Sequence, residues 1–306
     1  MQELEWIWVN GELVKWQEAK IHVLTHALHY GTAVFEGIRC YKTSRGPAVF
    51  RLDEHIQRLF DSAHIIKMCL PYSKEEVKEA TLAVIRANQV EECYIRPIAF
   101  RGYGEMGVDP TRCAVYFAIA VWCWGAYMGE KALREGVRAK VSSYVRNFIN
   151  SSSPRAKVSG NYLNSALAKM EAKELGYDEA ILLDVNGFVS EGSGENIFYV
   201  KNGVLYTPHP HSILLGITRD AVMQIAERLG IAVRETLVTR DDLYLADEAF
   251  FTGTAAEITP IVEVDGRTVG SGKPGDVTRR LQDVFFRVVR GEEPGYESWL
   301  SYVKEV

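Results

Sequence analysis

A lysine, a tyrosine and two glutamates lie near one another in the middle of the sequence. Lys157 and Tyr162 belong to the segment K-V-S-G-N-Y, and Glu191 and Glu195 belong to the glycine-rich segment S-E-G-S-G-E-N. An amine becomes a nucleophile only when it loses its proton near neutral pH, which requires partial burial or a neighbouring cation. These residue types therefore indicate chemistry that needs an amine, a phenol and a carboxylate.

Pyridoxal phosphate (PLP) is held by these three groups. A lysine forms a Schiff base with its aldehyde, a phenol meets the ring hydroxyl, and an acid pairs with the pyridinium nitrogen. The alternative is a solvated lysine beside a helix and two glutamates in a loop, which is the commoner situation for charged residues. The hypothesis therefore needs support from the rest of the chain.

Length and composition indicate a globular protein of two domains. The chain has 306 residues, of which 47% are hydrophobic and 25% are charged, and its net charge is −5. That charge gives no basic surface for nucleic acid. No apolar run approaches the roughly 18 residues that a membrane span needs, and the N-terminus does not resemble a signal peptide. The five cysteines are widely spaced, without a C-x-x-C pair, so we expect reduced thiols in a cytoplasmic protein.

The first part of the chain predicts an α/β arrangement. Residues 6–16 form a hairpin that turns at Asn10-Gly11. Residues 51–70 form a helix with Arg58 beside its apolar stripe, and Ser73 begins a second helix that reaches about Asn88. Pro97 lies within a predicted strand, which suggests an edge position or a bulge.

The second part predicts strands and helices that could position a phosphate. A helix should follow Lys157, because Leu163, Ala166, Leu167, Met170 and Leu175 recur at helical spacing, and Gly176 can end it. Residues 197–201 and 204–207 form another hairpin, and the last helix covers about 276–290. The turn at 216–218 leads into a helix N-terminus that could bind a phosphate, although most such turns bind nothing.

Three histidines offer a competing interpretation. His22, His26 and His29 are spaced four and three residues apart, so on a helix they would share a face and could bind zinc for a hydrolase. No carboxylate is placed nearby to orient the rings. We therefore favour packed, hydrogen-bonded histidines and predict no metal.

Six segments together resemble a known family. They are H-Y-G-T-A-V-F-E-G-I-R (29–39), Y-I-R-P (94–97), K-V-S-G-N-Y (157–162), S-E-G-S-G-E-N (190–196), G-I-T-R (216–219) and G-T-A-A-E (253–257). Each is weak alone, but their order resembles fold-type IV (D-alanine aminotransferase-like) PLP enzymes, and among these the branched-chain amino-acid aminotransferases. The resemblance implies a two-domain α+β or α/β fold. A small N-terminal α/β sandwich domain (1–124), an interdomain loop (125–136) and a larger PLP-binding pseudo-barrel domain (137–306) are expected.

The resemblance also implies roles in holding the cofactor. Lys157 would carry the Schiff base and later shuttle the proton. Glu191 would pair with the pyridine nitrogen, with Glu195 the less favoured partner, and Tyr162 would bond the ring hydroxyl. The phosphate would be held by Arg58, Ile217, Thr218 and Thr254.

Further residues are implied to bind the substrate. Thr254 and Ala255, with Tyr94, would receive its carboxylate, and Arg96 would reach the distal carboxylate of glutamate or 2-oxoglutarate. Because side chains alternate along a strand, Tyr94 and Arg96 should share a face, which favours branched-chain over D-amino-acid specificity. The apolar pocket would be shaped by Tyr30, Phe35, Trp124 and Tyr127.

The implied reaction is a reversible, ping-pong transfer of the amino group of L-leucine, L-isoleucine or L-valine to 2-oxoglutarate. The alternatives within the fold are a D-amino-acid transaminase, an (R)-selective amine transaminase and an aminodeoxychorismate lyase. A catalytically silent binding module is the alternative from another class. Arg101 is a departure from the expected pattern, and we expect it to point to solvent; Arg39 stays ambiguous. The partners would be amino acids and 2-oxo acids, in a homodimer or a higher homo-oligomer.

Overall fold

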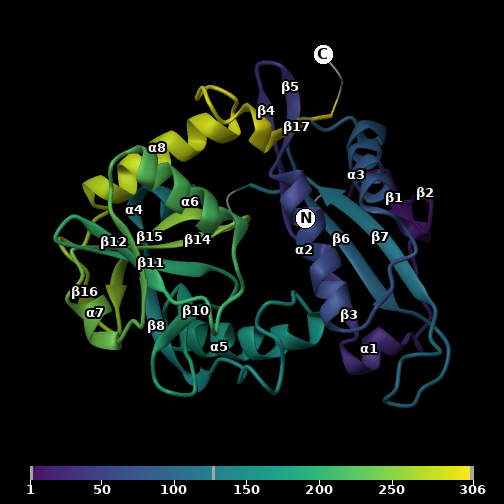
Figure 1. Ribbon diagram of the computed structural model, residues 1–306, viewed down its shortest axis with the longest axis horizontal. Helices are drawn as coiled ribbons and strands as arrows, with labels where there is room; N and C mark the ends of the chain where they lie inside the picture. Colours follow the sequence, from purple (N-terminus) through teal and green to yellow (C-terminus); the bar gives the residue numbers. More distant parts are fainter. Residues whose placement is uncertain (1–2, 126–127, 304–306) are drawn as a thin grey trace. The chain divides into compact units, whose positions relative to one another are not determined.

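The computed structural model describes residues 3–125 and 128–303 and divides the chain into two compact units, each built on one sheet (Figure 1). The first unit comprises Met1–Trp124, Ala156–Asn161 and Val288–Val306, and the second comprises Gly125–Arg155 and Tyr162–Arg287. The segments 156–161 and 288–306 thus group with the N-terminal residues, where the sequence predicts them in the second domain. Backbone pairing with the first unit explains this, because Tyr302 pairs with Ala48 and the Gly160 N–H donates to the Gly31 carbonyl at 3.2 Å.

The first unit contains an antiparallel sheet against which its helices pack. Its strand order is β17-β5-β4-β6-β7-β1-β2, and β3 pairs with β6. Helix α3 packs against α2, β1 and β7, and α2 also contacts β3. The elements are β1 (Trp6–Val9), β2 (Glu12–Lys15), η1 (Trp16–Glu18), α1 (His26–Tyr30), β3 (Ala33–Phe35), β4 (Ile38–Thr43), β5 (Gly46–Phe50), α2 (Leu52–Ile65), α3 (Lys74–Asn88), β6 (Cys93–Arg101), β7 (Val115–Trp122), η2 (Ser159–Asn161), η3 (Glu297–Trp299) and β17 (Leu300–Tyr302).

Local sequence signals explain several of these elements. The predicted N-terminal hairpin is confirmed as β1 and β2, and its turn uses Asn10 and Gly11 at φ 48° and 103°. Both predicted helices are present, but the first, α2, ends at Ile65 and not at residue 70, because Lys67 adopts a left-handed conformation with φ 54°. In α3 the Ser73 side chain accepts from the Glu76 N–H while the Glu76 carboxylate accepts from the Ser73 N–H, so two backbone donors of the first turn are satisfied.

Pro97 lies in the middle of the sheet, so the prediction of an edge or a bulge is wrong. It pairs with Ile119 of β7 in regular register. On the other side of β6, β4 pairs as far as Ile95 and β3 begins at Ile98. Pro97 falls between these two partners, and its carbonyl accepts from the Glu36 N–H at 2.9 Å. A residue without an N–H is tolerated there because neither strand pairs with it at that point.

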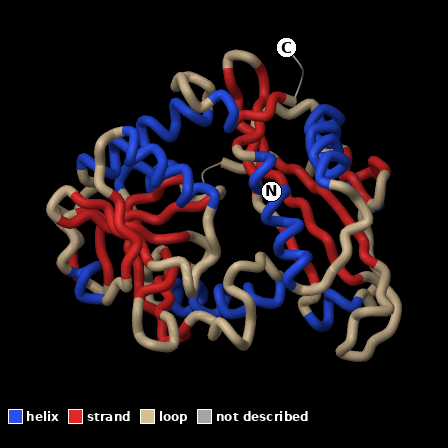
Figure 2. The backbone as a smooth tube through the Cα atoms, viewed as in Figure 1, coloured by secondary structure: helices blue, strands red, loops and turns tan. Residues whose placement is uncertain are grey.

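The second unit is a nine-stranded sheet whose strands curl around a common centre (Figure 2). Its order is β10-β9-β8-β15-β14-β11-β12-β13, and β16 pairs with β15. The predicted hairpin of β11 and β12 and the last helix, α8, are confirmed. The elements are α4 (Glu130–Glu135), β8 (Val137–Val145), α5 (Tyr162–Glu174), β9 (Glu179–Leu183), β10 (Val189–Gly192), β11 (Asn196–Lys201), β12 (Val204–Pro208), α6 (Ile217–Arg228), β13 (Val233–Thr236), α7 (Arg240–Tyr244), β14 (Glu248–Gly253), β15 (Glu257–Val264), β16 (Arg267–Thr268) and α8 (Asp276–Val289).

Helix α5 exists as predicted, but its apolar side chains do not form its buried face. Leu163, Met170 and the following Leu175 are exposed, whereas Ala168 and Ala172 are fully buried with Ala180 and Leu182 of β9. Small side chains let the helix backbone approach the sheet closely, so they make the contact. Gly176 ends the segment at φ +79°, as predicted.

Across the residues that the structure describes, no helix is both long and apolar enough to cross a membrane.

Candidate active site

The loop that carries Lys157 is fixed to the first unit by its backbone. The Lys157 N–H donates to the Ser62 hydroxyl at 3.0 Å, and the Lys157 carbonyl accepts from the Phe35 N–H at 3.1 Å. The amine Nζ lies 4.9 Å from the centroid of the Phe35 ring. A Cβ atom added to Gly31 would lie 2.7 Å from the Gly160 Cα, so a residue without a side chain is needed at Gly31, where it contacts the lysine loop. The amine is therefore half-buried on an aromatic face, as a nucleophilic lysine requires.

Helix α2 presents Arg58 beside the same loop. Arg58 forms a two-pronged ion pair with Glu36, in which Nε donates to Oε1 at 2.7 Å and Nη2 donates to Oε2 at 2.8 Å. His55 Nδ1 lies 2.8 Å from Glu36 Oε2. The Ser62 hydroxyl that receives the Lys157 N–H donates in turn to the Arg58 carbonyl at 2.8 Å. One helix thus positions both the arginine and the lysine loop.

Burial and charge act against each other at Glu36. Burial favours the neutral acid, but the attraction of Arg58 and the hydrogen bonds from Arg58 and His55 outweigh it, and the pKa of Glu36 lies well below its usual range. Burial lowers the pKa of His55, which keeps the imidazole neutral. The network therefore combines an anionic glutamate, a cationic arginine and a neutral histidine. Sequence reasoning noted the F-E-G segment but assigned no role to Glu36.

Strand β6 carries the predicted substrate residues Tyr94 and Arg96 on one face, as the strand period predicted. The Arg96 guanidinium lies over three rings, with its carbon 4.9 Å from the centroid of Phe35, 5.4 Å from Tyr94 and 5.7 Å from Trp122. Its Nε is buried and has no hydrogen-bond partner among the described residues. Trp122 was missed by sequence reasoning. Trp122 lies opposite Tyr94 in the pairing of β6 with β7, and that pairing cannot be read from the sequence alone.

The other predicted pocket residues have more varied surroundings. Trp124 packs edge-on against Tyr94 with centroids 4.8 Å apart. Gly37 is needed beside this tyrosine, because an added Cβ would lie 2.0 Å from its hydroxyl. The half-exposed Tyr30 donates its hydroxyl to the Met106 carbonyl at 2.9 Å. Tyr127 lies outside the described residues.

In the second unit, Glu191 is buried and fully engaged in hydrogen bonds. Its Oε1 accepts from Arg146 Nε at 2.7 Å, and its Oε2 accepts from Asn196 Nδ2 and from the Leu214 N–H, each at 3.1 Å. Arg146 follows β8, Glu191 lies in β10 and Asn196 begins β11, so residues from three segments of one sheet hold the carboxylate. Arg146 lies outside the six motifs, and Asn196 ends the motif at 190–196 without a role predicted for it.

Glu195 differs from Glu191 in its charge environment. It is buried near Glu179 and accepts from the Gly194 N–H at 3.0 Å. Burial, together with the charge of Glu179, raises the pKa of Glu195 to about 8. Lys169 pairs with Glu179 instead, and the Ser193 hydroxyl also donates to Glu179, at 2.6 Å. Glu191 therefore has an arginine partner, whereas Glu195 favours its neutral form.

The predicted phosphate residues of the second unit lie at two turns. Gly216 precedes α6, and Ile217 and Thr218 form its first turn with both side chains buried. A Cβ on Gly216 would lie 2.0 Å from Asn196 Oδ1, so the residue that binds Glu191 also packs against this turn. Thr254 and Ala255 follow β14 in a half-buried turn. Tyr162 begins α5 in the same unit and is half-buried.

Two arginines that the sequence left ambiguous have structural partners. Arg101 is buried, so the prediction that it points to solvent is wrong. Its guanidinium donates to the carbonyls of Cys113 at 3.2 Å and Lys67 at 2.9 Å. Arg39 is also buried and pairs with Glu92 at 3.1 Å. Both guanidinium groups therefore serve the fold of the first unit.

The three histidines have separate hydrogen-bond partners. His26 contacts the Thr32 hydroxyl and the Gly107 carbonyl, each at 2.8 Å, and His29 contacts the Val23 carbonyl at 2.9 Å. His22 accepts from the Leu24 N–H at 3.1 Å. Within 3–125 and 128–303 no group of three or more His, Cys, Asp and Glu residues could hold a metal ion.

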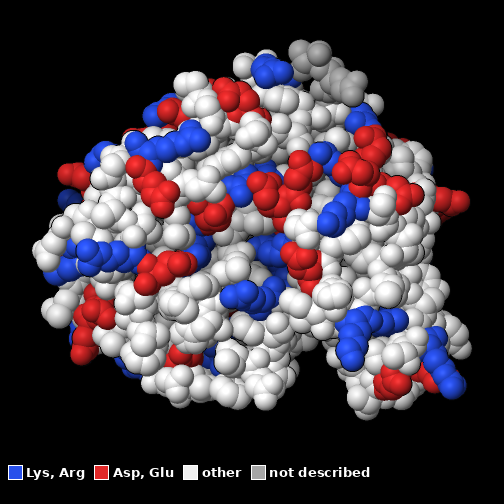
Figure 3. Space-filling model, in the orientation of Figure 1, with Lys and Arg blue, Asp and Glu red and all other residues white. Residues whose placement is uncertain are grey.

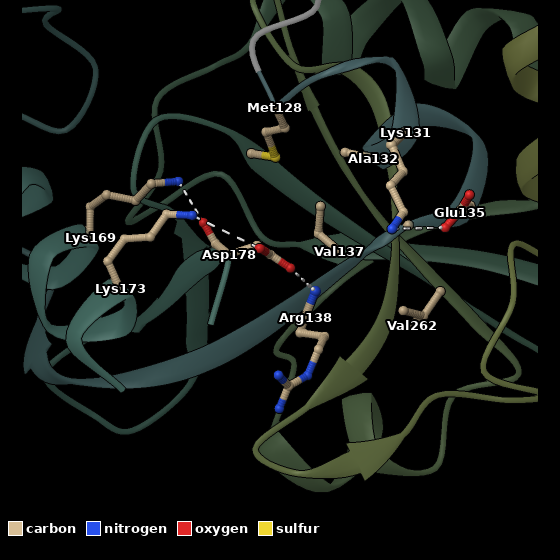
Figure 4. Close-up of a pocket in the computed structure, with 11 residues that line it drawn as sticks. Met128, Lys131, Ala132, Glu135, Val137, Arg138, Lys169, Lys173, Asp178 and Val262 are labelled. Atoms are coloured by element: carbon tan, nitrogen blue, oxygen red, sulfur yellow. Dashed lines mark hydrogen bonds and ion pairs between the residues drawn. The ribbon is translucent and has the colours of Figure 1, made fainter. Parts of the chain in front are cut away.

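A cavity of about 630 Å³ in the second unit contains none of the predicted site residues (Figure 4). It is lined by α4, the start of β8 and the end of α5, and its lysines alternate with acids. Lys131 pairs with Glu135 at 3.6 Å, and Lys173 pairs with Asp178 at 3.9 Å. The other two cations of the lining, Arg138 and Lys169, pair with Glu263 and Glu179 outside it, so each of its four cations has an acidic partner.

The family model described as amino-transferase class IV matches residues 33–264. The branched-chain-amino-acid aminotransferase of Pseudomonas aeruginosa is 52% identical over 298 residues, covering 97% of each chain. The crystal structure of the Escherichia coli branched-chain amino acid aminotransferase superposes with a TM-score of 0.97 at 51% identity, covering 99% of this chain and 100% of that one. The branched-chain amino acid aminotransferase from Thermobaculum terrenum, in its PLP-form, gives a TM-score of 0.93 at 36% identity and covers 100% of both chains.

The two sheets, with the curled sheet in the second unit, have the architecture of fold-type IV aminotransferases. The predicted fold class is therefore confirmed. The chain belongs to the class IV aminotransferase family and, within it, to the branched-chain-amino-acid aminotransferases.

The buried acid Glu195 predicts a distinctive pH dependence of stability. Its folded pKa of about 8 lies above the ordinary value of 4.5, so between these pH values the folded chain holds a proton that the unfolded chain releases. The free energy of unfolding should therefore fall as pH rises from about 4.5 to about 8, by up to about 1.4 kcal/mol per pH unit. Glu195→Gln, which resembles the neutral acid, should remove this fall in urea unfolding of the holoenzyme. The exposed Glu227→Gln serves as the control, and a fall of equal size in the Glu195→Gln protein would refute the assignment.

Proposed function

We propose that this chain is a PLP-dependent branched-chain aminotransferase that transfers the amino group of L-leucine, L-isoleucine or L-valine reversibly to 2-oxoglutarate. The products would be the branched 2-oxo acid and L-glutamate. The observation that carries the proposal is the amine of Lys157 on the Phe35 ring, in a loop tied through Ser62 to the helix of Arg58. About half of all residues are identical to those of relatives that bear this activity in their names.

The residues present fit PLP. Lys157 provides a half-buried amine, and Glu191 provides a buried carboxylate paired with an arginine. Tyr162 provides a phenol, and Arg58 provides a guanidinium of the kind that binds phosphate. Gly216 leaves the backbone bare at a helix N-terminus, where N–H groups suit a phosphate. When bound, PLP supplies an aldehyde that links to amines and a ring that withdraws electrons.

The predicted cofactor residues would have distinct roles. Lys157 would make the covalent link. The phosphate would be bound by Arg58, Ile217, Thr218 and Thr254. Glu191 would pair with the ring nitrogen and Tyr162 would meet the ring hydroxyl. Glu191 suits this role better than Glu195, since Arg146 stabilises its anion and burial raises the pKa of the Glu195 carboxyl.

The reaction needs one proton to move at the substrate. Lys157 Nζ would accept the proton from the Cα atom of the bound amino acid and would return one to the incoming 2-oxo acid in the reverse half. An amine held beside the substrate Cα atom would be suited to move this proton, because a general base must lie within hydrogen-bond reach of the proton that it takes. The α-carboxylate would be received by Tyr94, Thr254 and Ala255.

The surroundings of Arg96 explain how one pocket could accept two kinds of side chain. Phe35, Tyr94 and Trp122 form an apolar wall for a branched chain, and Tyr30, Trp124 and Tyr127 would extend it. The guanidinium over these rings provides a charge for the distal carboxylate of glutamate. An apolar wall alone would reject that carboxylate because of its desolvation cost. The buried Nε, which has no partner within the described part of the chain, is a donor that such an anion could satisfy.

The surface supports small-molecule partners and self-association. Lysines and arginines are interspersed with acids over the face in Figure 3, as expected for a chain of net charge −5 that binds no nucleic acid.

Apolar side chains of residues 21–30 and the neighbouring loop 103–108 are exposed, and such patches are typical of protein interfaces. We infer a homodimer or a higher homo-oligomer in the cytoplasm, where the five free thiols would stay reduced. The exposed apolar residues of the segments 21–30 and 103–108 are Ile21, Val23, Leu24, Leu28, Tyr30, Tyr103 and Val108.

Replacing the lysine tests the chemistry directly. Lys157→Ala should reduce transamination of L-leucine to background, because no other group is assigned to the covalent link or the proton transfer, while the circular dichroism spectrum stays unchanged. Lys173→Ala, on the exposed side of α5, should keep full activity. Substantial activity in the Lys157→Ala protein would rule out the mechanism.

Replacing Arg96 tests the dual pocket. Arg96→Met keeps the apolar bulk but removes the charge, so kcat/KM for 2-oxoglutarate should fall at least about tenfold more than kcat/KM for L-leucine. The exposed Arg267→Met serves as the control. Equal losses for both substrates would contradict the assignment, and a preference for D-alanine over L-leucine in the parent enzyme would contradict the substrate class.

A further inference from the structure

Glu191 forms a buried ion pair with Arg146. We propose that Arg146 is a positioning residue of the reaction, which keeps Glu191 ionised and holds its carboxylate in the orientation needed to pair with the ring nitrogen of PLP. This inference rests on the function proposed above.

Arg146 is anchored from three segments of the second unit. Its backbone N–H donates to the Leu183 carbonyl of β9 at 2.7 Å, and Nη1 donates to the Ser165 hydroxyl of α5 at 3.3 Å. The third contact is the 2.7 Å bond from Nε to Glu191 Oε1. The side chains of Arg146 and Glu191 are only 9% and 5% exposed, so water does not screen this pair.

Two further donors to Glu191 are neutral groups. Its Oε2 accepts from Asn196 Nδ2 and from the Leu214 N–H, and the same amide nitrogen also donates to the Leu214 carbonyl at 2.9 Å. These donors fix the carboxylate in space but bring no formal charge. Arg146 is the partner that compensates the negative charge within the contacts described here, and a buried carboxylate that loses its cation tends to take up a proton.

Glu195, which lies between β10 and β11, provides a comparison for the charge of Glu191. It is as deeply buried as Glu191 and also accepts a backbone hydrogen bond, but its nearest charged neighbours are Glu179, Glu191 and Lys169. The pKa of Glu195 is raised to about 8 by burial and then by Glu179. The contrast indicates what Glu191 would become without Arg146, since the two glutamates share a similar depth.

Protonation of Glu191 would change the cofactor in a defined direction. A neutral acid no longer stabilises a proton on the ring nitrogen, so the ring withdraws electrons less strongly. The nitrogen that links Lys157 to the cofactor then becomes more basic. The pH midpoint of the visible absorption band of bound PLP should therefore move upward when Arg146 is removed, and proton abstraction from the substrate should become slower.

Three arginine variants of the holoenzyme test this inference. Arg146→Met removes the charge and keeps much of the volume, and Arg146→Lys restores a cation without the planar guanidinium that contacts both Glu191 and Ser165. Arg138→Met is the matched control, because it removes another arginine–glutamate pair of the same sheet, Arg138 in β8 with Glu263 in β15 at 2.9 Å, where the arginine is half-exposed. PLP content, the pH titration of the visible band without substrate, the rate of the half-reaction with L-leucine and the melting temperature are measured for each.

In Arg146→Met we expect PLP to remain bound, the titration midpoint to rise by about one pH unit or more, and the half-reaction to slow at least about tenfold. Arg146→Lys should recover part of both changes, and Arg138→Met should show neither. An unchanged midpoint in Arg146→Met, with only a lower melting temperature, would reduce Arg146 to a structural role. If Arg146→Met does not fold, Arg146→Gln takes its place as the neutral variant, and a midpoint in Arg146→Gln equal to that of the parent would overturn the inference. A parent protein without a PLP band that depends on Lys157 would instead refute the proposed function.

Discussion

Buried carboxylates with arginine partners are the constraint on which the rest of this structure depends. Glu36 in the first unit and Glu191 in the second are each buried, and each is bound by one arginine, Arg58 or Arg146. Taking an ion out of water costs several kcal/mol, and a well-oriented partner with further hydrogen bonds is needed to offset that cost. The same interactions hold the functional groups in place, so in both units the stability of a buried ion pair and the geometry of the candidate site depend on the same side chains.

Helix α2 shows how a single element can serve several of these needs. His55, Arg58 and Ser62 lie on consecutive turns of its buried side, where they bind the Glu36 carboxylate and the backbone of the lysine loop. The second unit has a comparable arrangement around Asn196, whose side chain contacts Glu191 and packs against the turn at Gly216. In each unit the residues proposed to bind the cofactor are therefore coupled through shared hydrogen bonds, and substitution of one should disturb its neighbours.

Much of the fold could be predicted from local signals, because capping boxes, Asn-Gly turns and helical spacing act over a few residues. Burial was harder to predict, since it depends on which elements pack together. The apolar residues of α5 are partly exposed, and its alanines make the contact with β9. Pro97 is central because two short strands leave a gap opposite it, and Arg101 is buried because distant carbonyls of Lys67 and Cys113 receive its donors. Many motif residues could be assigned a role, but Glu36 and Asn196 lie within motifs and their partners depend on the fold. Arg146 and Trp122 lie outside the motifs, and only the strand arrangement places them beside Glu191 and Tyr94.

The central claim is that Lys157 is the residue that links covalently to PLP. Reduction of the purified protein with borohydride, followed by proteolysis and mass spectrometry, tests this claim most directly, because it fixes the link and locates it. The account predicts a reduced phosphopyridoxyl group on the peptide that contains Lys157 and on no other lysine peptide. An unmodified Lys157, or the group on a different lysine, would contradict it.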